Sequence, residues 1–315
     1  MHPIDVSTYE DDSDGLSTFE RALAFKAFSA FAQLTTPELA VLAENSRQRF
    51  FPKGTLMLEP GLPVHAFFLI VTGRVQMYEG GKPAREMGDR DTVGGVASLT
   101  RDPLGAHAVA LTDVVALEMG SDDVQDVFED NFSILVGVLG AMAATLRDGQ
   151  QRAGGLTLTP GQEMPAPRSS APLGLVEKMF LHRQAGGFGA ARIEVLADLA
   201  RDSDELHFTA GQRLWSRGDA SDHWHLILSG TLSCSDANGK QWRAGGGGAV
   251  LGALDALSDQ PRWYDMVAEG DVRTLRTSRI CLLDTLEDHS DMGMELLRTL
   301  AMAINQIFAK LSASG

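Results

Sequence analysis

Two histidines that flank one tryptophan are the first residues whose spacing could support chemistry. In His223-Trp224-His225 the two imidazoles fall on one face of a strand, because side chains alternate between the two faces. A cupin-like metal centre also needs a carboxylate shortly afterwards and a histidine on a later strand. Residues 226–229 contain no acid. We therefore favour a structural or surface pair and keep a cupin-like metalloprotein as the less favoured alternative.

Other reactive patterns are incomplete. The four glycines at 245–248 could cradle a phosphate, but no Lys-Ser/Thr follows them, so a flexible corner is the favoured interpretation. The sequence has no Gly-x-Ser-x-Gly, no His-Glu-x-x-His and no nucleophile–base set. His182 and His207 have no partners that the sequence reveals, and we expect both at the surface. The protein is predicted to be non-catalytic and to hold no metal.

Composition narrows the class of protein. The 315 residues carry a formal net charge of −15, which opposes binding to DNA and to anionic membrane surfaces. Cys234 and Cys281 lie in no ligand spacing, so a disulfide framework or a zinc site is not expected. No apolar run approaches the ~20 residues of a membrane span, and the first residues form no signal peptide. These observations predict a cytoplasmic protein.

The chain contains two sequence-related copies of one domain. Gly54, Gly61 and Gly73 recur as glycines 157 residues later, and the shift is 158 at Gly94 and at Asp113. A period of this length fits two copies of a whole domain rather than a solenoid. We refer to the two copies as the first and second repeats.

Each repeat has the same predicted order of elements. In the first, a helical pattern over 19–46 precedes short apolar runs over 49–118, and a helical stripe follows over 122–146. In the second, helices over 175–199 precede strands over 206–284, and a closing helix follows from about Asp291 to Leu311. The predicted domains are a disordered acidic tail (1–16), a first domain (17–150), a flexible linker (151–173) and a second domain (174–315).

This order, with fixed glycines at the strand corners, resembles the cyclic nucleotide-binding domain family. The resemblance rests on Phe50-Phe-Pro-Lys-Gly-Thr55 and Phe68-Leu-Ile-Val-Thr-Gly-Arg-Val75, and on the matching 208–211 and 226–230. Two such domains in tandem are similar to the regulatory subunit of cyclic-AMP-dependent protein kinase. Unlike the Crp-like receptor proteins, neither repeat is followed by a helix-turn-helix pattern. The resemblance implies an α+β, mainly β fold of two β-rolls (jelly rolls), each flanked by N- and C-terminal helices.

The family binds its ligand with Gly-Glu-Leu-Ala followed by Pro-Arg-x-Ala-Thr, where Glu contacts the ribose and Arg the cyclic phosphate. In the first repeat, Gly95 stands in place of the Glu and Leu104 in place of the Arg. Losing two charge-assisted hydrogen bonds, at ~1.5–3 kcal/mol each, would remove several decades of affinity. We therefore expect an empty pocket, whose lining the resemblance assigns to Gly94, Gly95, Val96, Leu104, Ala106 and His107.

The second repeat keeps one of the two charged residues. Arg262 follows its proline in register, but Ala253 replaces the Glu and Asp265 replaces a hydroxyl donor. A carboxylate there would repel a phosphate, and Arg262 could instead pair with Asp265 or Asp259 to stabilise the loop. The resemblance assigns this degenerate pocket to Gly252, Ala253, Leu254, Arg262, Tyr264 and Asp265.

The closing helix of the second repeat carries a heptad-like stripe. Its members step by three and four residues, and they are Leu297, Leu300, Ile304, Ile307 and Leu311. Packing onto the roll of the same chain would satisfy this stripe, and a homodimer contact is slightly favoured.

Two functional hypotheses follow. The first is a regulatory or adaptor protein with degenerate pockets that acts through contacts with a partner protein. The second is a cyclic-AMP or cyclic-GMP sensor that binds through Arg262, so that the only cofactor considered is a cyclic nucleotide in the second domain. Fold alone does not decide between them, because such domains serve many outputs.

Overall fold

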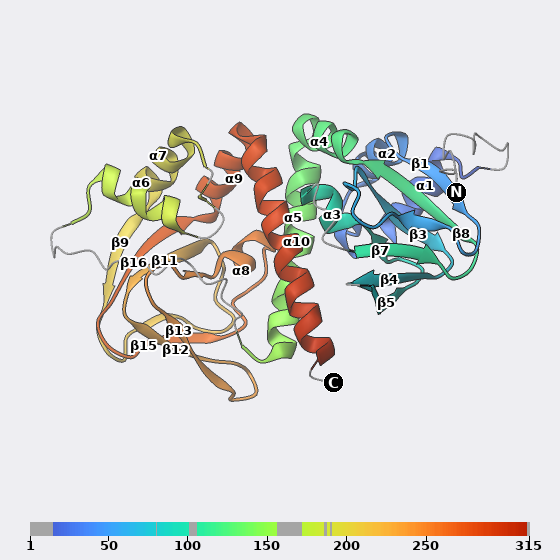
Figure 1. Cartoon of the computed structure of the whole chain (residues 1–315). Coiled ribbons are helices and arrows are strands. Elements are labelled where there is room, and N and C mark those ends of the chain that lie inside the picture. Colours follow the sequence, from blue (N-terminus) through green and yellow to red (C-terminus); the bar gives the residue numbers. More distant parts are fainter. Residues whose placement is uncertain are drawn as a thin grey trace. The chain divides into compact units, whose positions relative to one another are not determined.

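A computed structural model describes residues 15–79, 81–100, 106–155, 172–185, 188–189 and 191–313. Contacts divide the chain into two compact units, Met1–Gly137 and Val138–Gly315. The division falls inside one long helix, so the C-terminal part of that helix belongs to the second unit. Each unit is built around its own β-roll (Figure 1).

The first unit contains two four-stranded antiparallel sheets, in the strand orders β1-β8-β3-β6 and β2-β7-β4-β5. Its helices are α1 (Thr18–Lys26), η2 (Ser29–Phe31), α2 (Thr36–Glu44), α3 (Gly95–Thr100), α4 (Ser121–Asp130) and the start of α5 (Phe132–Ala153). Its strands are β1 (Arg47–Phe51), β2 (Leu56–Leu58), β3 (Ala66–Thr72), β4 (Val75–Glu79), β5 (Lys82–Met87), β6 (Thr92–Val93), β7 (Ala106–Ala110) and β8 (Val114–Gly120).

The second unit repeats this topology, with sheets in the orders β9-β16-β11-β14 and β10-β15-β12-β13. Its helices are α6 (Leu175–Gln184), α7 (Ile193–Asp202), α8 (Ala253–Leu257), α9 (Arg279–Asp288) and α10 (Ser290–Ala313). Its strands are β9 (Asp204–Phe208), β10 (Arg213–Trp215), β11 (His223–Ser229), β12 (Thr231–Ser235), β13 (Gln241–Gly245), β14 (Val250–Leu251), β15 (Asp265–Ala268) and β16 (Val272–Ser278). The predicted fold, two β-rolls flanked by helices, is confirmed.

One glycine corner shows why the repeated glycines are needed. Gly230 joins β11 to β12 at φ 95°, and a Cβ atom there would lie 2.4 Å from the carbonyl oxygen of Asp271. Gly73 occupies the same corner in the first unit, where a Cβ would lie 2.5 Å from the carbonyl oxygen of Asp113. Only glycine combines a positive φ with this close approach of two backbones.

The helix starts were predictable from local sequence. In α2, the Glu38 side chain accepts from the backbone N–H and hydroxyl of Thr35, with Pro37 in the first turn. Thr35 and Glu38 thus form a capping box at the start of α2. The strand prediction for the second repeat extended too far, however. Residues 279–288 form the helix α9, which begins at the Ser278 cap, so the last strand ends at Ser278.

The predicted tail and linker, and the predicted end of the first domain, can each be compared with the structure. Residues 1–14 of the predicted tail and 156–171 of the predicted linker lie outside the described residues. The predicted first domain ended at residue 150, whereas the compact units divide at Gly137. A helical period alone does not tell which of two cores the end of a helix joins, and here the end of α5 joins the second.

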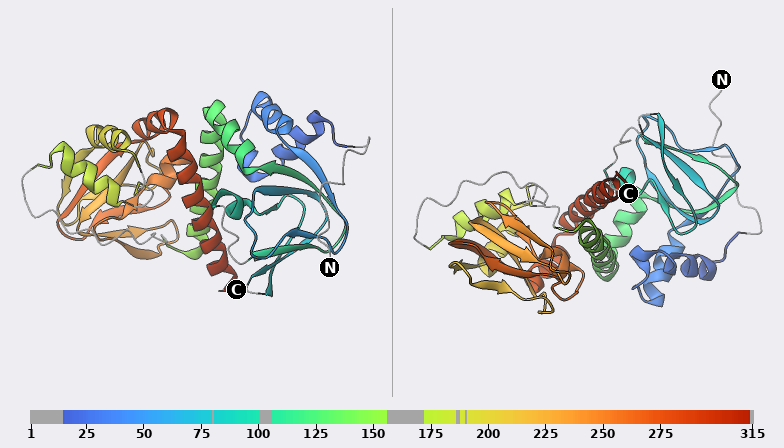
Figure 2. Two further views of the ribbon diagram at one scale, coloured as in Figure 1. Left: turned by 45° about the horizontal axis from the view of Figure 1, so that its top comes forward. Right: turned by 90° about the horizontal axis from the view of Figure 1, so that it is seen from below.

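The helix α5 also has the length and hydropathy of a candidate membrane span, unique in this respect among the described residues. Core helices of soluble proteins pass the same test. Two contacts of its C-terminal part show that this part packs against the second unit. Arg147 forms an ion pair with Asp255 of α8, and a Cβ on Gly149 would lie 3.0 Å from Ile307 of α10. The two helices lie side by side there (Figure 2).

His182 was predicted at the surface and is instead fully buried in the second unit. Its Nε2 lies 2.7 Å from the hydroxyl of Ser203, and its ring packs edge-on against Trp224. Burial lowers the pKa of His182 to about 4, with the charge of Lys178 contributing to this shift. The equivalent position in the first repeat is Phe25, which identifies this site as part of the core.

We predict that Gly230→Ala destabilises the second unit by about 2–4 kcal/mol, because the added methyl meets backbone in a left-handed conformation. Gly239→Ala is the matched control: its φ is 76°, but nothing lies within 4 Å of the added atom. The control should cost about 1 kcal/mol. Urea unfolding of both variants measures the difference, and equal losses would show that the close approach is unimportant.

His182→Phe should flatten the loss of stability in acid. A neutral buried histidine whose folded pKa lies below its unfolded value of about 6.5 stabilises the protein fully above that value. The stability is lost as pH falls, by about 2 kcal/mol at pH 5 for a folded pKa of about 4. Unfolding free energies of both proteins at pH 7 and 5 test this. An unchanged slope in the variant would mean that His182 does not titrate with unfolding.

Candidate functional site

The site suggested by the sequence lies between β14 and β15 of the second unit. Gly252 follows β14 at φ 79° and caps the short helix α8, and the segment 258–264 leads on to β15. A Cβ atom on Gly252 would lie 2.3 Å from Nη1 of Arg262. Glycine at this position therefore gives the guanidinium its place directly beside the backbone.

The Arg262 side chain points into the protein and is only 4% exposed as a residue. Its Nη1 donates to the carbonyl oxygen of Gly252 at 2.7 Å, and its Nη2 donates to the carbonyl oxygen of His223. The guanidinium carbon lies 4.4 Å from the centre of the Trp215 ring, a cation–π distance. The charge that the family resemblance assigns to a cyclic phosphate is thus directed at groups of this chain.

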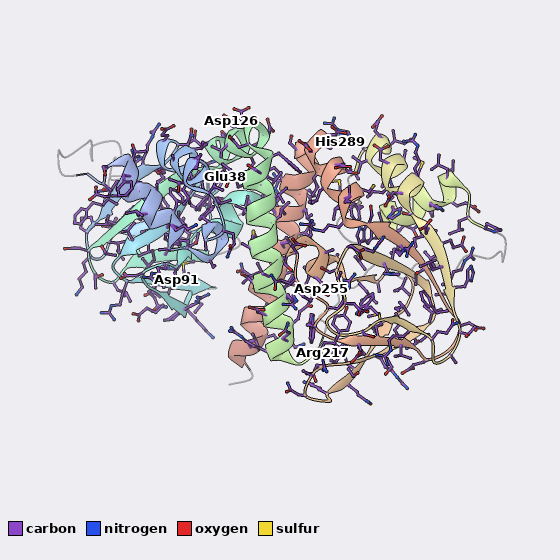
Figure 3. All side chains as sticks on the ribbon, turned by 180° about the vertical axis from the view of Figure 1, so that it is seen from behind. Glu38, Asp91, Asp126, Arg217, Asp255 and His289 are labelled. Atoms are coloured by element: carbon purple, nitrogen blue, oxygen red, sulfur yellow. The ribbon has the colours of Figure 1, made fainter. Side chains whose placement is uncertain are left out.

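The negative charge beside Arg262 comes from Asp255, which lies in α8 and is 2% exposed. Asp255 Oδ2 lies 3.5 Å from Arg262 Nη1, and Oδ1 accepts from Nε of Arg147 at 2.8 Å. Burial raises the pKa of Asp255, and the two arginines oppose this rise. We call these three side chains the buried charge cluster. Figure 3 shows Asp255 on the side of the second roll that faces α5.

Arg147 also holds the segment that carries Arg262. Its Nη2 donates to the carbonyl oxygen of Pro261 at 2.9 Å. Arg279 at the start of α9 donates to the carbonyl oxygen of Ala256 in α8 at 2.7 Å. The helix α8 is therefore tied to α5 through the Asp255 carboxylate and to α9 through the carbonyl oxygen of Ala256.

Both acids that we considered as partners of Arg262 have other partners. Asp265 accepts from Nη1 of Arg213 at 2.8 Å and from the backbone N–H of Arg217 at 3.1 Å. Asp259 lies 4.0 Å from Arg279. Within the described part of the chain the acidic partner of Arg262 is Asp255, so the predicted pairing with Asp265 or Asp259 is wrong. The prediction relied on nearness in sequence, but the Arg262 guanidinium points towards the preceding helix α8 and not along its own loop.

Aromatic rings fill the interior next to Arg262. Tyr264 is 1% exposed and makes edge contacts with Trp215 and Trp263, at ring distances of 5.5 and 4.8 Å. Trp242 stacks on Trp263 at 5.3 Å. Burial raises the pKa of the Tyr264 hydroxyl well above its ordinary value. Such rings each bury a large area, so this cluster contributes strongly to the core of the roll.

A cavity of about 150 Å³ lies against α8, and Asp255 is among the residues that line it. Leu254 of α8, Trp263 and Tyr264 line it, together with Leu146 of α5 and Leu300 of α10. Pockets for drug-sized ligands typically measure about 300–1,000 Å³. The cavity includes the predicted residues Gly252, Ala253, Leu254 and Tyr264, but Arg262 is not among its lining residues.

The pocket predicted for the first unit is only partly described. Leu104 lies outside the described residues, and the side chains of Val96 and Ala106 are not described. Gly94 has φ 82° and its carbonyl oxygen accepts from the backbone of Ser98 in α3, which begins at Gly95. His107 stacks on Tyr78 of the neighbouring strand at 4.6 Å. The assignment of a ligand-free pocket here stays a prediction.

The two histidines of β11 have separate neighbours. His223 Nδ1 lies 2.8 Å from Asp222, and His225 Nδ1 lies 3.2 Å from the hydroxyl of Thr274. Burial lowers the pKa of His225 to about 3, with the charge of Arg262 adding to the effect. Among the described residues no group of three or more His, Cys, Asp or Glu could hold a metal ion. The nearby glycines 245–248 form a corner tied to β11 by the bond from Gly248 to Ile227.

The stripe on the closing helix α10 is largely enclosed by the chain itself. Leu297, Leu300 and Ile307 are buried, while Ile304 and Leu311 are half-buried. Leu300 lines the cavity, and Ile307 packs on Gly149 of α5. Packing within the chain thus accounts for much of the stripe, and the dimer contact through it stays a prediction.

Comparison with known proteins identifies the class. The cyclic nucleotide-binding domain family matches residues 48–131 and 205–289, just over half of the chain. The chain belongs to this family and carries two of its domains in tandem. No curated protein matches the chain.

Several solved structures similar to the chain are regulatory subunits or regulatory domains of protein kinase A. They include cAMP-bound PfPKA-R (14% identity, 96% of this chain and 93% of that chain, TM-score 0.38). Another is the regulatory subunit of a cAMP-independent protein kinase A from Trypanosoma brucei (17%, 90% and 90%, 0.36). A third is the regulatory domain of Toxoplasma gondii PKA with cAMP (13%, 98% and 100%, 0.34). Similarity at these levels is no evidence for a shared ligand.

Sequence analysis placed Arg262 at the site but missed the residues that hold it. Asp255 was visible as an acid in the segment where the first repeat has Ala97, and this difference between repeats was the available signal. Arg147 and Trp215 gave no signal, because each reaches the site from a distant part of the chain. The contact between Arg147 and Asp255 spans 108 residues of sequence.

Asp255→Ala should destabilise the second unit by about 3–5 kcal/mol, because it leaves the enclosed Arg262 guanidinium without its carboxylate. The exposed pair of Arg243 and Glu269, whose atoms are 2.8 Å apart, is the control. Arg243→Ala should cost less than about 1 kcal/mol. Denaturant unfolding of the two variants measures both values. A loss below about 1 kcal/mol for Asp255→Ala would show that the buried charge cluster is not a stabilising unit.

Proposed function

We propose that this protein is a non-catalytic regulatory or adaptor protein whose second cyclic nucleotide-binding domain is closed from within by its own side chains. The observation that carries this proposal is the enclosure of Arg262. The guanidinium that would meet a cyclic phosphate already contacts two carbonyl oxygens, the Asp255 carboxylate and the Trp215 ring. Cyclic nucleotide-binding domains are regulatory modules, so the output of this chain is a contact with another protein.

Three features oppose nucleotide binding in this domain. To reach a phosphate, Arg262 would have to leave its carbonyl partners and Asp255, whose charge would then repel the ligand. Ala253 offers no side-chain acceptor for a ribose hydroxyl. Trp263 and Tyr264 line the remaining cavity, which is smaller than an ordinary ligand pocket. Freeing Arg262 and enlarging this cavity would both subtract from the binding free energy that a phosphate contact supplies.

The retained Arg262 also supports the alternative, a cyclic-nucleotide sensor. In that case the ligand would bind a minor open state and would shift the population towards it. The affinity would then be reduced by the fraction of molecules that are open. The sensor alternative and the closed pocket predict different results when the chain is titrated with cyclic nucleotides.

Isothermal titration of the full chain with cyclic AMP, cyclic GMP and a cyclic dinucleotide should give no saturable heat up to about 1 mM, which corresponds to about −4 kcal/mol. Arg262→Ala should behave in the same way. Micromolar binding that disappears in Arg262→Ala would overturn the closed pocket and establish the sensor. Circular dichroism of the variant confirms that it is folded.

A further inference from the structure

Exposed apolar side chains stand at equivalent positions of the two repeats. On α1, Phe19 is 68% exposed and Leu23 is 55% exposed. On α6, Val176 is 76% exposed and Phe180 is 58% exposed. The shift between the two pairs is 157 residues, the same as in the rolls. Residues four apart lie on one face of a helix, so each pair forms a small apolar patch. We call α1 and α6 the leading helices.

The two leading helices are seated on their units in the same way. Arg21 of α1 donates to the carbonyl oxygen of Ser46, and Lys178 of α6 donates to the carbonyl oxygen of Ser203. Lys178 corresponds to Arg21 and Ser203 corresponds to Ser46, each with the same shift of 157 residues. The inward face is therefore fixed equivalently in both units, and the apolar pair is presented outwards by the same geometry.

Single exposed apolar residues are common on protein surfaces. These pairs differ because they occur at corresponding positions of both repeats. Ile280 on α9 is 69% exposed, but the corresponding positions in the first repeat are Asp122 and Asp123. An isolated apolar residue of this kind needs no explanation. A patch that is present in both repeats, although the ligand segments have diverged, points to a shared use.

Charges flank each apolar pair in a self-complementary order. An exposed acid follows the first apolar residue (Glu20 on α1, Glu177 on α6), and an exposed base stands one turn beyond the second (Lys26 and Arg183). When two such helices pack antiparallel, the acid of each meets the base of the other beside the apolar contact. Lys26 and Arg183 each donate one hydrogen bond to their own chain, and further donors remain on both groups.

We infer that the outward faces of the leading helices are a self-association surface, and that the leading helix of a second copy of this chain packs antiparallel on them. Charge complementarity selects the second copy over an unrelated partner, because each face is its own electrostatic complement. The overall charge of −15 repels two copies of the chain from each other, so the complementary charges of this face must offset that repulsion. This inference does not depend on the closed pocket, and its test contains no nucleotide.

Analytical ultracentrifugation of the full chain, from about 1 to about 200 μM, tests the proposal. We expect a reversible dimer. Leu23→Glu should raise the dimer dissociation constant at least about tenfold if α1 takes part in the contact, and Phe180→Glu should do so if α6 takes part, since each places a charge in an apolar contact. Ile280→Glu, an equally exposed substitution without a counterpart in the first repeat, should leave the dissociation constant unchanged.

A charge-reversal series identifies which helices meet. Arg183→Glu should weaken association at least about tenfold if α6 takes part in the contact, and Lys26→Glu should do so instead if α1 pairs with α1. Adding Glu177→Lys to Arg183→Glu restores association if α6 pairs with α6, and adding Glu20→Lys restores it if α6 pairs with α1; either rescue supports the proposal. Both acids accept from the backbone at their helix starts, so thermal unfolding of each variant must confirm that the fold is kept. Where Arg183→Glu weakens association, rescue by neither would contradict antiparallel packing.

Two results would overturn the inference. A chain that stays monomeric over the whole concentration range has no such surface. A dimer that Leu23→Glu and Phe180→Glu leave intact assembles elsewhere, for example through the α10 stripe. If the chain is monomeric and a different protein binds it in a manner that depends on Leu23 and Phe180, the surface belongs to that partner and the second copy is excluded.

Discussion

The enclosure of the Arg262 guanidinium is the constraint on which the rest of the second unit's site depends. A buried cation is tolerated only when a carboxylate and hydrogen-bond acceptors surround it, because its desolvation costs several kcal/mol. Asp255 supplies the carboxylate, and two backbone carbonyl oxygens supply acceptors. Gly252 must then be glycine, since a side chain there would occupy the position of the guanidinium. The identities of Asp255 and Gly252 are thus both explained by the buried charge of Arg262.

Comparison of the two repeats separates the scaffold from the site. The corner glycines Gly73 and Gly230 make the same close approach, and the leading helices make the same contact with the turn before their first strand. The segment around Arg262 differs in almost every position that could contact a ligand. A fold keeps its backbone crossings because any side chain there clashes, whereas the residues of the segment around Arg262 are under no such backbone constraint.

The fold could be predicted from the sequence because the features that indicate it each act over a few neighbouring residues. Glycines at corners, alternating apolar runs and capping residues are such features, and their repetition confirmed the pattern. The sequence was insufficient for the site because the deciding contacts are tertiary. Arg147 comes from a helix whose period does not reveal its neighbours, and the direction of the Arg262 side chain depends on Trp215. The helix α9 was missed because its mixed sequence follows a strand without a break by Gly or Pro.

The buried charge cluster also changes what the second domain can respond to. In a ligand-regulated domain the phosphate supplies the charge that fixes the arginine, so the position of the surrounding helices depends on occupancy. Here Asp255 supplies that charge permanently, and Arg147 ties it to α5. A ligand shifts an equilibrium only by its different affinity for two states, and folding has already selected one of them. Under the proposed function, regulation by this chain is carried by surfaces that remain open to a partner, and the leading helices present apolar side chains to solvent in both units.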